Sequence, residues 1–355
     1  MKILISAISL AILLLCAAVR GAEPKIPIIH STDLFHPHAD PDDHFDLATL
    51  FAIKEYDIKG IILDNHGSDQ MTHGGRPAVE QMMHITGRKT PYAVGLKTRL
   101  RNRDDKVLEE PESLQGGVKL ILSVLRESHK KVVLNVVGSA TDTSAAFNRE
   151  PELFKNKVKA IYLQAGNGPD GPQPEYNVGL DPVAYARLLE SGLPIYWCPC
   201  FGKDGYQTYY VLADQSKTFA ACAKPVQNFF VYCFTLSKED PIAFLTSGSH
   251  PLPGGNRNMW CTAPMFHVAG RAIYQRGADD FVALTPAAAE KAGLADKAVN
   301  VFSFVPVQVD TSNFPKLRVA LNPAKTNTFV FRTTDPRYEQ IMASCLKNLL
   351  AELGR

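Results

Sequence analysis

The chain has little net charge, and this lack of positive charge argues against a nucleic acid polymer as partner. Its 355 residues contain 38 Lys and Arg against 36 Asp and Glu, and no basic stripe with interleaved aromatic residues occurs. Proteins that bind nucleic acid polymers concentrate Lys and Arg on one surface. A nucleic acid polymer is therefore a poor candidate partner, and the 45% hydrophobic and 21% charged residues indicate an ordinary globular protein.

Cysteine is too sparse for a disulfide scaffold. Of the seven cysteines, Cys16 lies in an N-terminal apolar run and the others are at 198, 200, 222, 233, 261 and 345. Only Pro199 separates Cys198 from Cys200, whereas redox and zinc motifs space their cysteines by two residues. An exported protein could form disulfides, but a domain of this size does not need them. We expect buried free thiols.

Long apolar runs are absent after the first residues. Met1-Lys2 followed by the apolar residues 3–19 has the form of a secretory signal peptide, with cleavage after Gly21 or Ala22. A membrane span needs about 20 apolar residues, so a permanent anchor is the less favoured alternative. We expect residues 1–22 to be a signal peptide and the protein to be exported, either periplasmic or extracellular.

Short apolar runs alternate with helical patterns from residue 25 to about residue 200. Strands are expected at 26–31, 58–63, 132–137, 158–164 and 194–198, and their nearly continuous apolar content is typical of strands buried on both faces. Helices are expected at 43–56, 78–86, 115–128, 139–155 and 182–191. The alternation predicts an α/β fold with an open, mostly parallel sheet and helices on both faces.

The pattern weakens after residue 200. Helices are expected at 219–236, 264–273 and 336–353, and strands at 301–309, 317–321 and 328–332. No repeat or linker is visible, so we expect one domain over residues 23–300. Residues 301–355 should form a β-rich C-terminal elaboration packed on the same domain.

An acidic cluster follows the first expected strand. Within residues 30–51 lie Asp33, Asp40, Asp42 and Asp43, with His36, His38 and His44. In open α/β sheets ligands bind beyond the carboxyl ends of the strands, and like charges this close need compensation by a cation or a substrate. Carboxylates suit Ca²⁺ or Mg²⁺, the histidines suit Zn²⁺ or Fe²⁺, and a solvated loop with an N-capping Asp remains the alternative.

This arrangement resembles the nucleoside hydrolase family, the inosine-uridine preferring N-ribohydrolases, whose first motif is DxDPGxDDAxA. Residues 31–33 match the strand end and residues 42–48 match the helix start, with residues 34–41 as an insertion. Asp40 is an alternative to Asp33 for the first acidic position. Asp33 is favoured because it directly follows the strand.

Further segments resemble the family in order and spacing. Residues 136–142, followed by residues 151–153, resemble the segment GPLTN and its trailing Pro-Glu-Leu, with Thr141 at the position whose carbonyl binds Ca²⁺. Residues 162–167, which end at Asn167, resemble the strand ending in MGG. Glu175-Tyr176-Asn177 and then Asp181-Pro182 resemble ExNxxxDP, which holds the ribose.

The resemblance implies roles for these residues. Asp33, Asp43 and the carbonyl of Thr141 would bind Ca²⁺, which is expected ahead of Mg²⁺, Zn²⁺ or Fe²⁺, and Asp33 would also act as the general base on water. The expected substrate-binding residues are Asp42, Glu175, Asn177, Asn167 and Trp260. The implied activity is hydrolysis of the N-glycosidic bond of a ribonucleoside or related riboside. The partner is thus a small-molecule nucleoside, and a homo-oligomer remains open.

One departure from the family pattern concerns the last calcium ligand. The family has an Asp there, in one subgroup within a Trp-Asp pair, whereas this chain has Trp260-Cys261. A thiol is a poor Ca²⁺ ligand, so Asp40 could replace it, and Asp240 is a more distant alternative. This departure keeps two other hypotheses open: a catalytically silent envelope protein that binds a sugar or nucleoside, and a zinc or iron hydrolase that uses the three histidines.

Two further histidines are candidates for the acid that protonates the leaving base. His66 and His267 could do so, but a single histidine in such a place is more often structural.

Overall fold

The computed structural model describes residues 25–38, 41–65, 74–169 and 174–355, so the expected signal peptide lies outside the described part. A nine-stranded sheet runs through this part in the order β13-β12-β14-β6-β5-β4-β1-β2-β3. Its strands from β1 to β6, together with β14, are parallel, and β12 is antiparallel to both of its neighbours. The parallel strands are β1 (Ile26–Thr32), β2 (Tyr56–Leu63), β3 (Tyr92–Val94), β4 (Val132–Val137), β5 (Val158–Leu163), β6 (Ile195–Trp197) and β14 (Thr328–Thr333).

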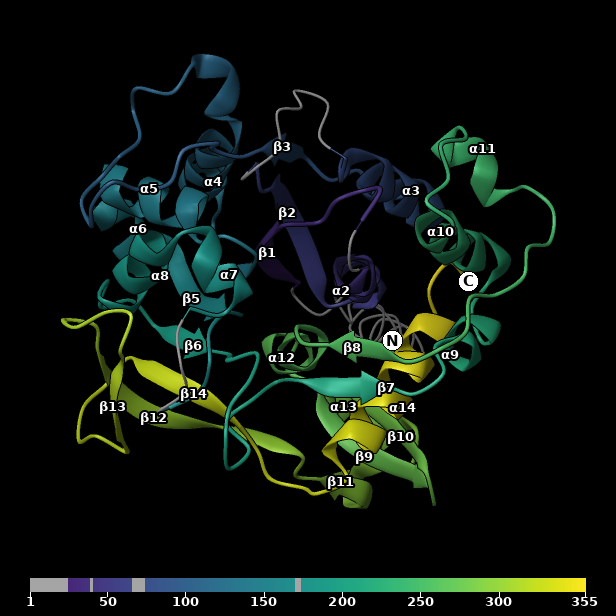
Figure 1. The fold of residues 1–355 in the computed structure, drawn as a ribbon. Helices are drawn as coiled ribbons and strands as arrows, with labels where there is room; N and C mark the ends of the chain where they lie inside the picture. The colour runs from purple at the N-terminus through teal and green to yellow at the C-terminus, as the bar shows by residue number, and fades with distance from the viewer. Residues whose placement is uncertain (1–24, 39–40, 66–73, 170–173) are drawn as a thin grey trace, which may run out of the picture.

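Helices cover both faces of the sheet, as the alternating pattern predicts (Figure 1). Successive residues of a strand point to opposite faces, so Ile28 and Ile29 enter two different cores. One face carries α4 (Gly116–Glu127), α5 (Thr141–Arg149), α6 (Pro151–Lys157) and α8 (Pro182–Leu189). The other carries α2 (Asp42–Ala52), α3 (Arg76–Thr86), α10 (Lys224–Phe234), α12 (Thr262–Val268) and α14 (Tyr338–Ala351).

Four expected helices differ from the observed ones. The helix expected at 219–236 is divided between α9 (Ser216–Ala220) and α10, with residues 221–223 outside both. The helix expected at 139–155 is two helices, α5 and α6, because the chain leaves helical geometry at Glu150, directly before Pro151. The helix expected at 264–273 ends at Val268, and the strand β9 begins four residues later. The expected helix at 43–56 ends at Ala52, and the residues after it lead into β2.

The helix α2 is buried nearly all round rather than on one stripe. Every residue from Asp43 to Ala52 is buried, because α3, α12 and α14 all pack against this helix. A helix covered on all sides holds its N-terminal residues firmly in place. The two acids that open α2 therefore project from a rigid element.

The C-terminal strands extend the main sheet instead of forming a separate layer. The strand β14 pairs with β6 in parallel, and β12 (Phe302–Asp310) and β13 (Arg318–Leu321) continue the sheet beyond it. Smaller elements surround this frame: α7 (Tyr176–Leu180), α9 (Ser216–Ala220), α11 (Pro241–Leu245), α13 (Pro286–Lys291), β7 (Tyr210–Leu212), β8 (Arg257–Met259), β9 (Ala272–Gly277), β10 (Asp280–Leu284) and β11 (Ala298–Val299), with 3-10 turns at Glu112–Leu114 and Ala295–Lys297. Nothing in the sequence pattern predicted β7 to β11.

One expectation about composition is answered in the described part, whose six cysteines are all buried and free, as expected. No helix among the described residues is long and apolar enough to cross a membrane.

Candidate active site

The carboxyl ends of β1, β2 and β4 meet at one point. Thr32 at the end of β1 pairs with Val137 at the end of β4. A Cβ at the following Gly138 would lie 2.7 Å from the backbone nitrogen of Asp33 and would also meet the carboxylate of Asp64, which follows β2. Only glycine permits this approach. Asp33 and the segment that leads to Thr141 thus lie at the same end of the sheet.

Asp43 joins this point from α2. The Thr32 hydroxyl donates to Oδ1 of Asp43 at 2.8 Å and accepts from the Leu34 backbone nitrogen at 3.1 Å. Asp42 is half-buried beside it in the first turn of α2, where carboxylates suit the positive end of the helix dipole. The chain therefore anchors Asp43 to the end of β1, next to Asp33.

Burial and crowding raise the pKa values of these acids. Burial raises the pKa of Asp33 to about 7, and the negative charge of Glu175 adds to the shift. Burial also raises the pKa of Asp43 well above its usual range, and the negative charges of Asp33, Asp42 and Asp46 raise it further. Added positive charge at this point would relieve the repulsion.

Asp64 is a further buried acid at this point, and it was not predicted from the sequence. Its carboxylate accepts from the Ser139 backbone nitrogen, and burial followed by the charge of Asp33 raises its pKa. The rule that selected Asp33, an acid at the carboxyl end of a buried strand, would also have selected Asp64.

Asp181 holds Thr141 at the start of α5. The Thr141 hydroxyl donates to Oδ2 of Asp181 at 2.7 Å, and Asp181 also accepts from the backbone nitrogens of Leu100 at 2.9 Å and Ala184 at 3.0 Å. One buried carboxylate thus ties together α5, α8 and the loop after β3.

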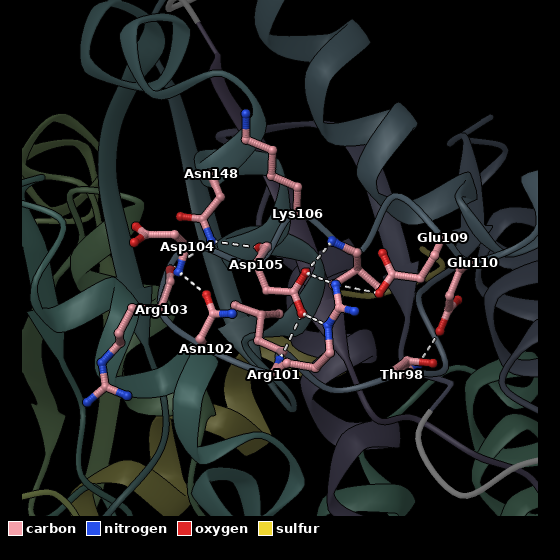
Figure 2. A network of polar contacts seen from close by, with 12 residues as sticks. Thr98, Arg101, Asn102, Arg103, Asp104, Asp105, Lys106, Glu109, Glu110 and Asn148 are labelled. Atoms are coloured by element: carbon pink, nitrogen blue, oxygen red, sulfur yellow. Dashed lines mark hydrogen bonds and ion pairs between the residues drawn. The ribbon is translucent and has the colours of Figure 1, made fainter.

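A polar network on the same loop supports α5 from outside (Figure 2). Arg101 donates to both carboxylate oxygens of Asp105 at 2.7 and 3.0 Å. Asn148 of α5 donates to the carbonyl oxygens of Arg103 and Asp105. This network fixes the loop to the helix that begins at Thr141.

Glu175 and Asn177 lie over the ends of β4 and β5. The Glu175 carboxylate caps α7 and accepts from the backbone nitrogens of Gly166 at 2.6 Å and Asn177 at 3.0 Å. The Asn177 amide nitrogen donates to the carbonyl oxygens of Gln164 at 3.0 Å and Val137 at 3.4 Å. Asn177 therefore ties strand ends together, a contact that was not predicted from the sequence.

An aromatic group lies near these loops. The Trp260 ring is 6.1 Å from that of Phe201 and 5.9 Å from that of Tyr209, and Phe201 is 43% exposed. The backbone of Asn167 forms a parallel bridge with Phe201, which connects this group to the end of β5. Trp260 is half-buried rather than part of the core. Phe201 and Tyr209 were missed because no motif marks them.

Cys261 lies beside the acidic cluster. It is buried directly before α12, and burial followed by the charge of Asp46 raises the pKa of its thiol. The charges of Asp42 and Asp43 act on it in the same direction. The Trp260-Cys261 pair therefore borders the site.

The histidines of the insertion have contacts to α10. Nε2 of His36 lies 2.8 Å from the carbonyl oxygen of Ser237, and Nε2 of His38 lies 3.1 Å from that of Cys233. The His36 ring also stacks on Tyr232 at 4.7 Å. Two of the three histidines thus use a ring nitrogen to hold the insertion against the end of α10.

The other sequence candidates have structural contacts or lie outside the described part. His267 is 2.7 Å from the Tyr162 hydroxyl and packs among aromatic rings, so it is a satisfied structural histidine. Asp240 caps α11 by accepting from two backbone nitrogens, which argues against the distant alternative ligand. Asp40 and His66 lie outside the described residues.

The donor atoms at the strand ends suit a hard cation. Asp33 and Asp43 offer carboxylate oxygens, and both oxygens of the buried Asp46 lack a hydrogen-bond partner among the described residues. Oxygen donors of this kind favour Ca²⁺ or Mg²⁺ over Zn²⁺. Within residues 25–38, 41–65, 74–169 and 174–355, no three His, Cys, Asp or Glu side chains already lie close enough together to hold an ion.

Comparison with known proteins gives the family. The family model for inosine-uridine preferring nucleoside hydrolases matches residues 28–244. A pyrimidine-specific ribonucleoside hydrolase, RihA of Citrobacter koseri, is 25% identical over 222 residues, which cover 57% of this chain and 68% of that protein.

Two solved structures share the fold over almost the whole chain. The purine-preferring ribonucleoside hydrolase from Gardnerella vaginalis superposes with a TM-score of 0.52 at 17% identity, covering 92% of this chain and 99% of that one. The effector protein XOO4466 gives 0.55 at 14% identity, covering 94% and 95%. With the family match over most of the chain and acids at the expected strand ends, the chain belongs to the inosine-uridine preferring nucleoside hydrolase family.

Proposed function

We propose that this chain is an exported, Ca²⁺-dependent N-glycosidase that hydrolyses the bond between a ribose and an aromatic base. The observation that carries the proposal is Asp33, which lies at the end of β1 beside Asp43 and within reach of the charge of Glu175. Burial raises its pKa to about 7 when no cation is bound, so Asp33 is a stronger base than an exposed carboxylate.

The cation would be held by Asp33, Asp43 and the backbone carbonyl of Thr141. When bound, Ca²⁺ supplies positive charge that offsets the crowded carboxylates and makes a water molecule easier to deprotonate. Asp181 and the loop network behind α5 hold Thr141 in position for this task.

Asp33 takes the proton from the attacking water. Asp42 binds a ribose hydroxyl from the start of α2, and Glu175 and Asn177 border the ribose from the loops over β4 and β5. As the base departs, the sugar becomes positively charged, and the nearby carboxylates stabilise that charge.

The aromatic group formed by Phe201, Tyr209 and Trp260 supports an aromatic leaving group, with Asn167 beside it. Aromatic rings stack on any nucleobase, so this group favours nucleosides without selecting one base. A relative described as pyrimidine-specific and a fold neighbour described as purine-preferring suggest both classes as test substrates.

Release of nitrophenol from a nitrophenyl riboside tests the proposal. We expect turnover in Ca²⁺ and its loss in a chelator, together with release of free base from uridine or inosine. The alternative is a silent protein that binds a nucleoside or sugar in the same place, and Cys261 at the position of the family's late Asp favours it. Tight riboside binding without turnover would support that alternative.

A further inference from the structure

Asp46 is a buried acid to which the mechanism gives no task. It lies on α2 four residues after Asp42 and three after Asp43, so the three side chains lie on one side of the helix. Asp46 is 1% exposed, and neither of its carboxylate oxygens has a hydrogen-bond partner among the described residues. A buried, unpartnered carboxylate is unfavourable unless something compensates it.

The surroundings of Asp46 point to the cation site. Burial and then the charge of Asp33 raise the pKa of Asp46, and the charge of Asp46 in turn acts on Asp43. Asp46 is thus within electrostatic range of both expected carboxylate ligands. The Cys261 thiol lies next to it and lowers its pKa, but does not form a regular hydrogen bond with it.

Both members of the Asp46 and Cys261 pair depart from the family pattern. The motif DxDPGxDDAxA has Ala at the position of Asp46, and the family's late Asp corresponds to Cys261. One neighbour has gained a carboxylate and the other has lost one. The family pair is Ala and Asp, and the pair in this chain is Asp46 and Cys261. Each pair therefore contains one carboxylate and one small side chain.

We infer that Asp46 supplies the third carboxylate of the cation site in place of Cys261, an inference that rests on the proposed function. Ca²⁺ takes six to eight oxygen ligands, and more anionic ligands raise its affinity. Asp46 must turn to reach the ion, since no three acids converge already among the described residues. No regular hydrogen bond of its carboxylate has to break for that movement.

The test is Ca²⁺ titration calorimetry on the full chain and on Asp46→Asn, which removes the charge and keeps the shape. We expect the variant to bind Ca²⁺ at least about tenfold more weakly. In a chelator its melting temperature should rise, because the variant no longer buries an unpartnered charge, and the Ca²⁺-induced increase in melting temperature should shrink. A purely structural acid would instead lower the melting temperature and leave Ca²⁺ affinity unchanged.

A swapped variant and a control complete the experiment. Asp46→Ala combined with Cys261→Asp restores the family arrangement and should recover most of the Ca²⁺ affinity that Asp46→Ala alone loses. Asp280→Asn removes a partly buried acid that accepts hydrogen bonds from Arg276 and Asn348 and has no task in the proposed site, so it should leave Ca²⁺ affinity unchanged.

Two outcomes overturn the inference in different ways. If the parent binds Ca²⁺ and hydrolyses ribosides while Asp46→Asn binds Ca²⁺ equally well, the inference is wrong and the proposed function stands. If the parent neither binds Ca²⁺ nor hydrolyses ribosides, both fall together.

Discussion

At the scale of single residues, the site is a set of acids whose charges oppose one another. Burial is the main cause that raises the pKa of four of these acids, Asp33, Asp43, Asp46 and Asp64. The negative charge of another carboxylate in the site raises each of these pKa values further. Proteins shift pKa values in this way at functional sites more often than elsewhere. The arrangement is unfavourable for folding and becomes useful when a cation or a positively charged sugar is present.

The general-base role predicts a pH profile. Asp33 must be deprotonated to accept a proton from water, so the rate should fall about tenfold per pH unit below its pKa. This pKa is about 7 when no cation is bound, and bound Ca²⁺ should lower it. Asp33→Asn should lower the rate by about 100-fold or more and remove this dependence. Steady-state rates from pH 4 to 9 in saturating Ca²⁺ measure both, and a parent rate that stays flat over the whole range would contradict the role.

The same pKa predicts how stability depends on pH in a chelator. The folded protein holds the Asp33 proton up to a pH of about 7, whereas an unfolded carboxyl releases it near pH 4. Between these values the folded state binds more protons, so the contribution of Asp33 to stability is lost as the pH rises through this window. Urea unfolding should show a smaller loss between pH 5 and 8 for Asp33→Asn than for the parent, and equal losses would contradict the shift.

Phe201 allows a test of the leaving-group site. Phe201→Ala should raise KM for an aromatic riboside by about tenfold with little change in kcat, because stacking on one base contributes roughly 1–3 kcal/mol. Leu108→Ala removes an apolar side chain that is 65% exposed on the loop after β3 and serves as the matched control. A KM that rises equally in both variants would argue against stacking at Phe201.

At the scale of elements, short connections from rigid strands and helices position the acids. The end of β1, the start of α2 and the tight turn at Gly138 fix Asp33 and Asp43. Asp181 fixes the start of α5. Carboxylates at strand ends and helix starts thus gain precision from elements that are packed on several sides.

The pairs Asp181-Pro182 and Asp240-Pro241 allow a comparison between an Asp that supports the site and an Asp that caps a helix. Asp181 caps α8 and also accepts hydrogen bonds from Thr141 and Leu100, whereas Asp240 accepts hydrogen bonds among the described residues from the first turn of the short helix α11 alone. Asp181→Ala should lower the free energy of unfolding by about 2–4 kcal/mol because buried partners lose their acceptor, and it should weaken Ca²⁺ binding. Asp240→Ala should cost about 1 kcal/mol and leave Ca²⁺ binding unchanged. Equal effects in urea unfolding and calorimetry would show that Asp181 acts as a cap alone.

The sequence predicted the elements that depend on local pattern and missed those that depend on distant partners. The five expected strands between residues 25 and 200 appear with boundaries within two residues of the expected ones, because their apolar runs are continuous. The strands β3, β7, β8 and β11 were missed, because they are only two or three residues long and pair with strands far away in the chain. The hairpin of β9 and β10 was missed, because its strands mix polar with apolar residues. For the same reason Asp33 and Asp43 were found from their places beside elements, while Phe201 and the tie made by Asn177 were not.

At the scale of the whole molecule, the C-terminal residues complete the sheet. The strand β14 lies between β6 and β12, and α14 contributes Ile341, Met342 and Leu346 to the core that also holds α2. Residues 301–355 are therefore predicted to be part of the same folding unit as the site (Figure 1).

Truncation tests this prediction. A chain that ends at residue 300 would expose one side of β6 and uncover α2, so we expect it to be insoluble or to lack a cooperative thermal transition. Calorimetry of the full chain should show one transition with equal calorimetric and van't Hoff enthalpies. A truncated chain that folds and binds Ca²⁺ would place these residues outside the essential domain.

The central claim is that one cation, held by the acids at the end of β1 and the start of α2, is required for riboside hydrolysis. The most direct test measures Ca²⁺ binding by calorimetry and the rate of nitrophenyl riboside hydrolysis over the same range of free Ca²⁺ on the same protein. Our account predicts one essential ion per chain and a rate that rises with the same midpoint as binding. A rate that does not depend on Ca²⁺, or that saturates at a different Ca²⁺ concentration from binding, would contradict it.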